Sequence, residues 1–189
     1  MALVGSIHVD IGWQLPDLTL MDVDERLMSL HSQMGEHGLL VAFTCNHCPY
    51  AVAVWPRLIR HAAAIREMGV HTVAVNPNIH PDYPADSLGA MQQKKIEWAI
   101  DFPYLADDTQ SAAKLFEAQC TPDIYLFDAN GGLFYHGRID DDWKDESNVM
   151  CNELMDAIER LVAGDTPPQP QYPTIGCSIK WLDEINDSD

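Results

Sequence analysis

The sequence predicts a layered α/β fold with a central mixed sheet, and two features of the residue pattern predict it. The first half alternates short apolar runs with longer runs of helical periodicity, in the order strand, helix, strand, helix. Such an order is typical of parallel strands joined by crossover helices. Further along, two apolar runs flank Asn130-Gly131-Gly132, which indicates a β-hairpin. The hairpin adds antiparallel strands, so the predicted sheet is mixed.

The predicted strands are short apolar or alternating runs bounded by turn residues. The run at 38–44 is continuously apolar and starts at Gly38, which suits a strand buried on both faces. A turn is expected at 22–25, followed by a short helix at 29–34. The remaining strands are predicted at 13–20, 70–75, 124–127 and 133–136, with a short extended piece at 103–106.

The helices are predicted from apolar residues at helical spacing. One follows the strand at 38–44 directly and ends at Gly69, a typical C-terminal stop. Pro49 and Pro56 are expected to kink it or loosen its first turns. The other helices are predicted at 84–100, at 109–116 with Asp108 as the N-cap, and at 147–163 before Gly164.

The composition limits the classes of partner. The 189 residues carry a formal net charge of −18, and 47% of them are hydrophobic. Binding to nucleic acid or to an anionic membrane is not expected, because both require a basic surface. The length suits one well-packed domain, predicted at residues 1–164, with a proline-rich extended tail at 165–189.

The cysteine content favours a reducing compartment. The chain has five cysteines, an odd number at wide spacing, unlike a secreted disulfide framework. The first residues show neither a basic segment nor a long apolar one, so no signal peptide is expected, and no run reaches the length of a membrane helix. We therefore expect a cytoplasmic protein, in which a close cysteine pair is catalytic or metal-binding.

The pair Cys45-Asn46-His47-Cys48 follows a buried strand and precedes a helix. At a helix N-terminus, unpaired amides and the helix dipole stabilise a thiolate, which is the nucleophilic form. We expect Cys45 to lie at this terminus and to attack, and Cys48, one turn later, to resolve the mixed disulfide. A protonated His47 would stabilise the thiolate further and make the disulfide more oxidising than that of thioredoxin, about −270 mV, towards the glutaredoxin range of about −200 to −230 mV.

Other interpretations of the pair stay open. It could be half of a zinc site, although no second ligand pair with suitable spacing is present. It could also be a purely structural pair. Attachment of a c-type haem requires a histidine directly after the second cysteine, and Pro49 occupies that position. No metal and no cofactor are expected.

Several segments together resemble the thioredoxin superfamily, and more narrowly the redoxin proteins related to alkyl hydroperoxide reductase and thiol-specific antioxidant. The resemblance covers about Trp13 to Trp181. The segments that carry it are 39–50, which contains Cys-Asn-His-Cys-Pro-Tyr, together with 73–77, 102–107, 120–123, 137–141 and 175–181. It implies a thioredoxin core at about 38–164, an N-terminal β extension at 1–37 and an inserted helix after the second core strand.

The resemblance also implies roles for individual residues. Thr121 and Pro122 match the cis-proline loop that faces the cysteine pair and binds substrate, and Asn46 and Tyr50 are further candidates to contact substrate. Two family features are missing. Peroxiredoxins carry threonine three residues before a single peroxidatic cysteine, whereas Thr44 directly precedes Cys45. The buried carboxylate that many thioredoxins place six residues before the first cysteine is replaced here by leucine.

The three remaining cysteines have different expectations. Cys120 is either a third thiol near the pair or a small buried apolar residue. Cys177, beyond the prolines of the tail, either pairs with another cysteine or stays free. Cys151 shares a predicted helix face with Leu154 and Ile158, so it is expected in the core.

The function that the sequence favours is a thiol–disulfide oxidoreductase acting on protein or small-molecule thiols and disulfides. The alternatives are a thiol peroxidase and a redox-sensing or zinc-binding module. The oligomeric state and the physiological substrate are not encoded in any pattern described above.

Overall fold

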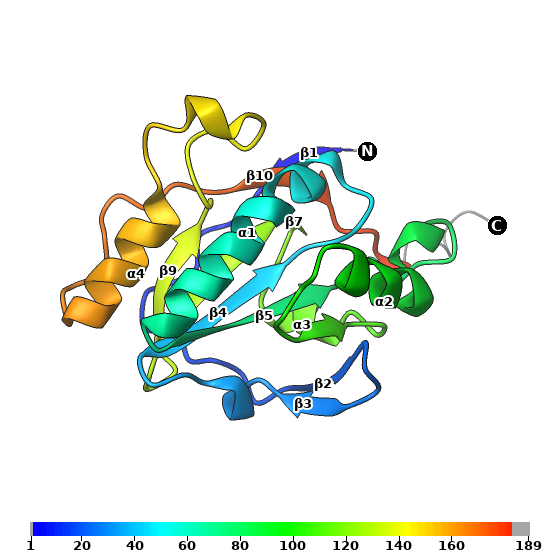
Figure 1. The fold of residues 1–189 in the computed structure, drawn as a ribbon, viewed down its shortest axis with the longest axis horizontal. Coiled ribbons are helices and arrows are strands. Elements are labelled where there is room, and N and C mark those ends of the chain that lie inside the picture. Colours follow the sequence, from blue (N-terminus) through cyan, green and yellow to red (C-terminus); the bar gives the residue numbers. More distant parts are fainter. Residues whose placement is uncertain (1, 183–189) are drawn as a thin grey trace.

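The structure is a computed structural model that describes residues 2–182. Its centre is a seven-stranded sheet in the order β3-β2-β6-β5-β4-β8-β9 (Figure 1). The strands of this sheet are β2 Thr19–Asp22, β3 Leu27–Ser29, β4 Gly38–Phe43, β5 Val70–Asn76, β6 Tyr104–Ala106, β8 Asp123–Asp128 and β9 Leu133–Gly137. The pairs β4–β5 and β5–β6 are parallel, whereas β4–β8 and β8–β9 are antiparallel. The predicted mixed α/β sheet is confirmed.

Helices cover both faces of this sheet. They are α1 Pro49–Glu67, α2 Leu88–Glu97, α3 Ser111–Leu115 and α4 Glu153–Ala163. Side chains of α1 and α4, such as Leu58 and Ile158, belong to the core on one face, and Ala112 of α3 belongs to the core on the other. In Figure 1, α1 lies in front of the central strands, and α4 lies next to β9 at the left. The central strand β4 is buried along its whole length because it is covered on both faces, as its continuous apolar run predicts.

A second, three-stranded sheet lies beside the start of α1. Its order is β1-β10-β7, with β1 Leu3–Gly5, β7 Cys120–Thr121 and β10 Ile175–Ser178. Both pairings are antiparallel. The proline-rich tail therefore contributes a strand, β10, that pairs with β1 near the N-terminus and with β7 just before β8.

Several predicted boundaries are wrong, and the causes are local. The helix predicted at 84–100 starts as a single 3-10 turn, Pro84–Asp86, and the α-helix begins only after Ser87, whose hydroxyl accepts a hydrogen bond from the Ala90 amide. The helix predicted at 147–163 begins at Glu153, because Asn152 is its N-cap, and η3 Glu146–Asn148 precedes it separately.

Further predictions about element bounds, a helix cap and the burial of one cysteine are also wrong. The strand predicted at 13–20 is regular only from Thr19, and the helix predicted at 29–34 reduces to the 3-10 turn η1 His31–Gln33. At α3 the carboxylate that accepts amide hydrogen bonds belongs to Asp107, not Asp108. Cys151 is exposed, which contradicts its predicted burial, because it lies before α4 rather than on its inner face.

Candidate thiol redox site

Three cysteines from distant parts of the sequence meet where β4 ends, α1 begins and β10 crosses β7. Cys45 and Cys48 lie in the segment between β4 and α1, and Cys177 lies in β10. Their side chains form one buried cluster with Ala51, and Tyr50 packs against it. All three sulfurs are free thiols in this structure, so the site is described here in its reduced form.

Thr121 contacts both members of the predicted pair. Its hydroxyl oxygen is 3.2 Å from Cys45 Sγ, and its carbonyl oxygen is 3.2 Å from Cys48 Sγ, whose thiol donates to it when neutral. The peptide bond between Thr121 and Pro122 is cis. The loop that the resemblance places opposite the cysteine pair therefore lies directly against it.

The helix begins later than the sequence predicts, and this changes which thiol it stabilises. Cys48, not Cys45, is the N-cap of α1, with Pro49 as the first helical residue. Hydrogen bonds from the thiols of Cys45 and Cys177 and from the Ala51 amide lower the pKa of Cys48 to about 5, against the opposing effect of burial. The expectation that Cys45 lies at the helix N-terminus is wrong, because Pro49 disfavours a helical conformation at the preceding residue, and Cys48 is accordingly extended.

Cys45 is fully buried, as is Cys48. Burial raises the pKa of Cys45 well above its usual range, and the hydrogen bond to Cys48 and the negative charge of Asp86 raise it further. Because one thiol of a close pair is favoured as the anion, the other retains the proton. The contacts around Cys48 therefore favour the anion at Cys48 and the proton at Cys45.

A buried carboxylate, Asp86, lies beside the pair, and no sequence pattern predicted it. Asp86 is fully buried, and its side chain is hydrogen-bonded to His47 Nδ1. Its other oxygen accepts hydrogen bonds from the Asn46 amide at 2.6 Å and from Asn76 Nδ2 at 2.9 Å. The 3-10 turn before α2 thus places an acid against the segment between the two cysteines.

Cys45, His47 and Asp86 form a compact set of titratable groups. One sulfur, one ring nitrogen and one carboxylate oxygen lie within 4.8 Å of one another. His47 Nε2 is buried and has no hydrogen-bond partner among residues 2–182. Because Asp86 is already bonded to His47 and to two nitrogen donors, we interpret this set as an acid–base group serving Cys45 rather than as a metal site.

The two further residues predicted to contact substrate are placed differently. Asn46 is turned inward: its Nδ2 donates to the Ala85 carbonyl at 2.8 Å and its Oδ1 accepts from Tyr104 OH at 3.0 Å. Its polar groups therefore hold the inserted segment. The ring of Tyr50 lies against that of Trp143, with centroids 3.9 Å apart.

A cleft beside Pro122 could admit part of a substrate. It has a volume of about 110 Å³ and is lined by Val54, Pro122, the segment 138–141, Trp143 and the segment 173–175. It ends at the strand that carries Cys177. Cys120, by contrast, is buried in β7 with its thiol directed to the Pro122 carbonyl, and burial raises the pKa of Cys120 above its usual range.

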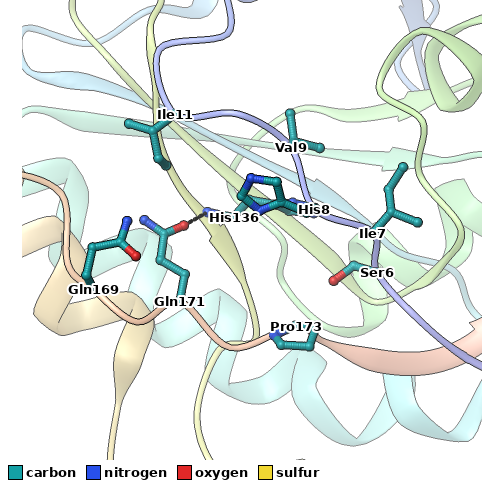
Figure 2. Close-up of a pocket in the computed structure, with 9 residues that line it drawn as sticks. All are labelled: Ser6, Ile7, His8, Val9, Ile11, His136, Gln169, Gln171 and Pro173. Atoms are coloured by element: carbon teal, nitrogen blue, oxygen red, sulfur yellow. Dashed lines mark hydrogen bonds between the residues drawn. The ribbon is translucent and has the colours of Figure 1, made fainter.

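Another cavity, of about 280 Å³, lies away from the cysteines (Figure 2). It is lined by residues of the N-terminal segment, by His136 and by the tail, and none of its lining residues is a cysteine. The dashed line in Figure 2 is the hydrogen bond from the His136 amide to Gln171 Oε1, 2.9 Å long. The His136 ring is itself bound to the buried Asp123 carboxylate at 2.9 Å, so we treat this cavity as separate from the thiol site.

A thiol cluster at the head of a helix, on a mixed sheet covered by helices, defines the class of thioredoxin-like redox proteins. The sequence model of the AhpC/TSA family matches residues 11–136. The chain belongs to this family, and the resemblance stated from the sequence is confirmed. Membership supports a thiol redox function and a general oxidoreductase role.

Solved structures give the same picture. An uncharacterized conserved protein from Geobacillus kaustophilus has 36% sequence identity and a TM-score of 0.90, with 96% of this chain and 97% of that chain covered. A hypothetical protein from Sinorhizobium meliloti 1021 has 33% identity and a TM-score of 0.89, with 94% and 98% covered. A secreted Mycobacterium tuberculosis disulfide oxidoreductase, homologous to E. coli DsbE, shares the fold, with 18% identity, a TM-score of 0.57 and coverage of 78% and 96%.

Two further comparisons complete the description. No curated protein matches the chain significantly. Within residues 2–182, no helix combines the length and the apolar character that a membrane crossing requires.

Proposed function

We propose that this protein is a thiol–disulfide oxidoreductase whose catalytic pair is Cys45 and Cys48. The observation that carries the proposal is the packing of the two thiols in one buried cluster at the start of α1, with Thr121 touching both sulfurs. Two thiols held this close form a disulfide with little rearrangement, so the site can exchange two electrons with a substrate. No cofactor takes part.

The order of attack that we propose is the reverse of the order expected from the sequence. The thiolate is the nucleophile, and the interactions described above favour the thiolate at Cys48. Cys48 attacks a substrate disulfide, forms a mixed disulfide and expels one substrate thiolate, which takes up a proton. Cys45 then attacks the Cys48 sulfur, so that the second substrate thiolate leaves and the Cys45–Cys48 disulfide forms.

Cys45 needs a base for this second step, because it retains its proton in the reduced site. We assign this role to His47, with Asp86 as the group that positions it. The Cys45 proton passes to His47 and from there to the departing substrate thiolate. The substrate disulfide is thereby reduced to two thiols while the protein is oxidised, and the reverse sequence introduces a disulfide.

The proposed substrates are protein or small-molecule disulfides and thiols. A cysteine-bearing segment would lie in the cleft beside Pro122, with Tyr50 and Trp143 at its edge. We place the reaction in the cytoplasm, where a close thiol pair stays reduced between turnovers. The odd number of cysteines at wide spacing fits such a compartment.

The test uses two double variants, each of which leaves one thiol of the pair unresolved. Cys177 is replaced in both, because it contacts Cys48 and could take over resolution. Cys45→Ser/Cys177→Ser is expected to retain a substrate as a stable mixed disulfide on Cys48, identified by mass spectrometry. Cys151→Ser, which removes an exposed thiol, is the control and should keep wild-type disulfide-reducing activity.

Each other outcome has a distinct meaning. A trapped substrate on Cys45 in Cys48→Ser/Cys177→Ser, with none on Cys48, would restore the order expected from the sequence. Consumption of hydrogen peroxide by the reduced protein without disulfide exchange would make it a thiol peroxidase. Stoichiometric zinc in the purified protein, lost in Cys48→Ser, would make it a metal-binding module.

A further inference from the structure

The strand β10 occupies the edge of the loop that faces the cysteine pair. Cys177 pairs with Thr121 and Ser178 with Cys120 in an antiparallel register. Thr121 is the residue whose hydroxyl and carbonyl contact Cys45 and Cys48. The backbone of β10 is therefore aligned with the part of the site that contacts the reactive sulfurs.

Gly176 allows this close approach. A Cβ atom at residue 176 would lie 2.1 Å from the Thr121 carbonyl oxygen and 2.7 Å from its carbon. Any other residue would force β10 away from β7, so glycine is required here by contact rather than by backbone conformation.

The thiol of Cys177 points into the cluster rather than to solvent. It is 4% exposed, and it packs with Cys48 in the buried cluster. Burial, and then the contact with Cys48, raise the pKa of Cys177 to about 12. In the reduced site Cys177 is therefore a proton donor to the Cys48 thiolate. Once Cys48 is bonded in a disulfide, its contribution to the raised pKa of Cys177 disappears.

An extended peptide is commonly recognised by adding a strand to an exposed sheet edge. Here the protein's own β10 makes that addition and presents a cysteine to Cys48 as a bound substrate would. Resolution of a disulfide requires the attacking sulfur to lie beside the sulfur that it attacks. The position of Cys177 in β10 places its sulfur beside that of Cys48. Cys120, on the same two-residue strand as Thr121, directs its thiol to the Pro122 carbonyl instead.

From this arrangement, and resting on the proposed function, we propose that β10 is a built-in pseudo-substrate whose Cys177 is a third redox residue, forming a disulfide with Cys48. In the oxidised protein, Cys177 attacks the Cys48 sulfur of the Cys45–Cys48 disulfide. The Cys48–Cys177 bond forms, the Cys45–Cys48 bond breaks, and Cys45 leaves as a thiolate that takes up the Cys177 proton. No net oxidation occurs, and Cys45 is released as a free thiol.

The experiment treats Cys45→Ser with oxidised glutathione, blocks the remaining thiols by alkylation and maps the digested protein by mass spectrometry. Cys48 first takes up one glutathione, and Cys177 then displaces it as reduced glutathione. The expected product carries no glutathione and contains a peptide pair linked through Cys48 and Cys177. In Cys45→Ser/Cys177→Ser the glutathione should stay on Cys48.

A second pair of variants tests the seating of the strand without removing any thiol. In the Cys45→Ser background, Gly176→Ala displaces β10 by on the order of 1 Å, and linkage should slow by about 10²-fold, as misplacement of a reacting group by this distance can do. Gly89→Ala, whose added methyl group meets nothing within 4 Å, should leave the linkage rate unchanged.

The outcomes separate this inference from the proposed function. Glutathione that remains on Cys48 in Cys45→Ser, with no linked peptide, would overturn the role of Cys177 while showing that Cys48 attacks disulfides. An unaltered linkage rate in Gly176→Ala would overturn the role of the β10 register. If neither Cys45 nor Cys48 reacts with glutathione disulfide in the wild-type protein, the proposed function itself fails.

Discussion

Lowering the pH of the reduced protein should leave Cys48 reactive under conditions in which an ordinary thiol is silent. Its pKa of about 5 compares with 9.0 for an unperturbed thiol. Between pH 8 and pH 6 the thiolate fraction of Cys48 should fall by only about 10%, whereas that of an unperturbed thiol falls roughly a hundredfold. Reactivity at Cys48 should be lost only as the pH passes through about 5.

The assay is alkylation of the reduced protein with iodoacetamide, read residue by residue by mass spectrometry. Each rate is normalised to its own value at pH 8, so that burial of Cys48 does not enter the comparison. Exposed Cys151 serves as the reference thiol within the same molecule. A Cys48 rate that falls tenfold for each unit of pH between 8 and 6 would refute the assignment of the thiolate to this residue.

The same shift affects the stability of the reduced protein. A thiol whose pKa is depressed by folding adds stability above its unfolded pKa and loses that contribution as the pH falls through its folded pKa. The free energy of unfolding of the reduced form, relative to the oxidised form, should therefore rise between pH 5 and pH 9. Cys45, whose pKa is raised, opposes this only above the unfolded value. Urea unfolding of both forms at pH 5 and pH 8 measures the difference.

Stabilisation of the thiolate favours the reduced site, so the disulfide should be more oxidising than that of thioredoxin, above about −270 mV and towards −200 to −230 mV. Titration against glutathione measures this potential. A value at or below −270 mV would show that the helix start and the neighbouring thiols do not stabilise the Cys48 anion.

Two buried charges give further predictions, both measured by urea unfolding. Asp86→Asn should cost about 1–3 kcal/mol, because the amide cannot reproduce the buried hydrogen bonds that the carboxylate makes with His47, Asn46 and Asn76; exposed Asp82→Asn should stay within about 0.5 kcal/mol, and equal costs would contradict the argument. Arg57→Met should cost about 3–5 kcal/mol, because it leaves Asp140, bonded at 2.6 Å, buried without its partner. The matched surface change Arg60→Met should cost less than about 1 kcal/mol, and a similar loss for the two arginines would show that burial is not the cause.

The sequence by itself determined the features that depend on neighbouring residues. The continuous apolar run before Cys45 predicted a strand buried on both faces, and the Asn130-Gly131-Gly132 turn predicted the hairpin β8–β9. The spacing of Cys45 and Cys48 was sufficient to predict a thiol pair at the end of a strand. Each of these signals lies within a few residues of the element that it specifies.

Local patterns were less informative about where helices start. The residue that caps a helix is chosen by competition among neighbours, and the chain offers several capping residues near each start. Ser87 and Asn152 are the N-caps of α2 and α4, at positions other than those expected from periodicity. Cys48 rather than Cys45 is the N-cap of α1. That shift of three residues moved the stabilised thiolate from one cysteine to the other.

Only the tertiary structure decided which distant groups join the site. Asp86 is bonded to His47, which lies 39 residues away in the sequence. Cys177 pairs with Thr121, although the hairpin β8–β9 and α4 separate the two residues in the sequence. Neither contact leaves a periodic trace, because a single carboxylate or thiol brought in by chain topology has no pattern of its own. The proposed redox pair and its proposed base, His47, were therefore encoded locally, whereas the carboxylate that holds His47 and the third thiol were set by the fold.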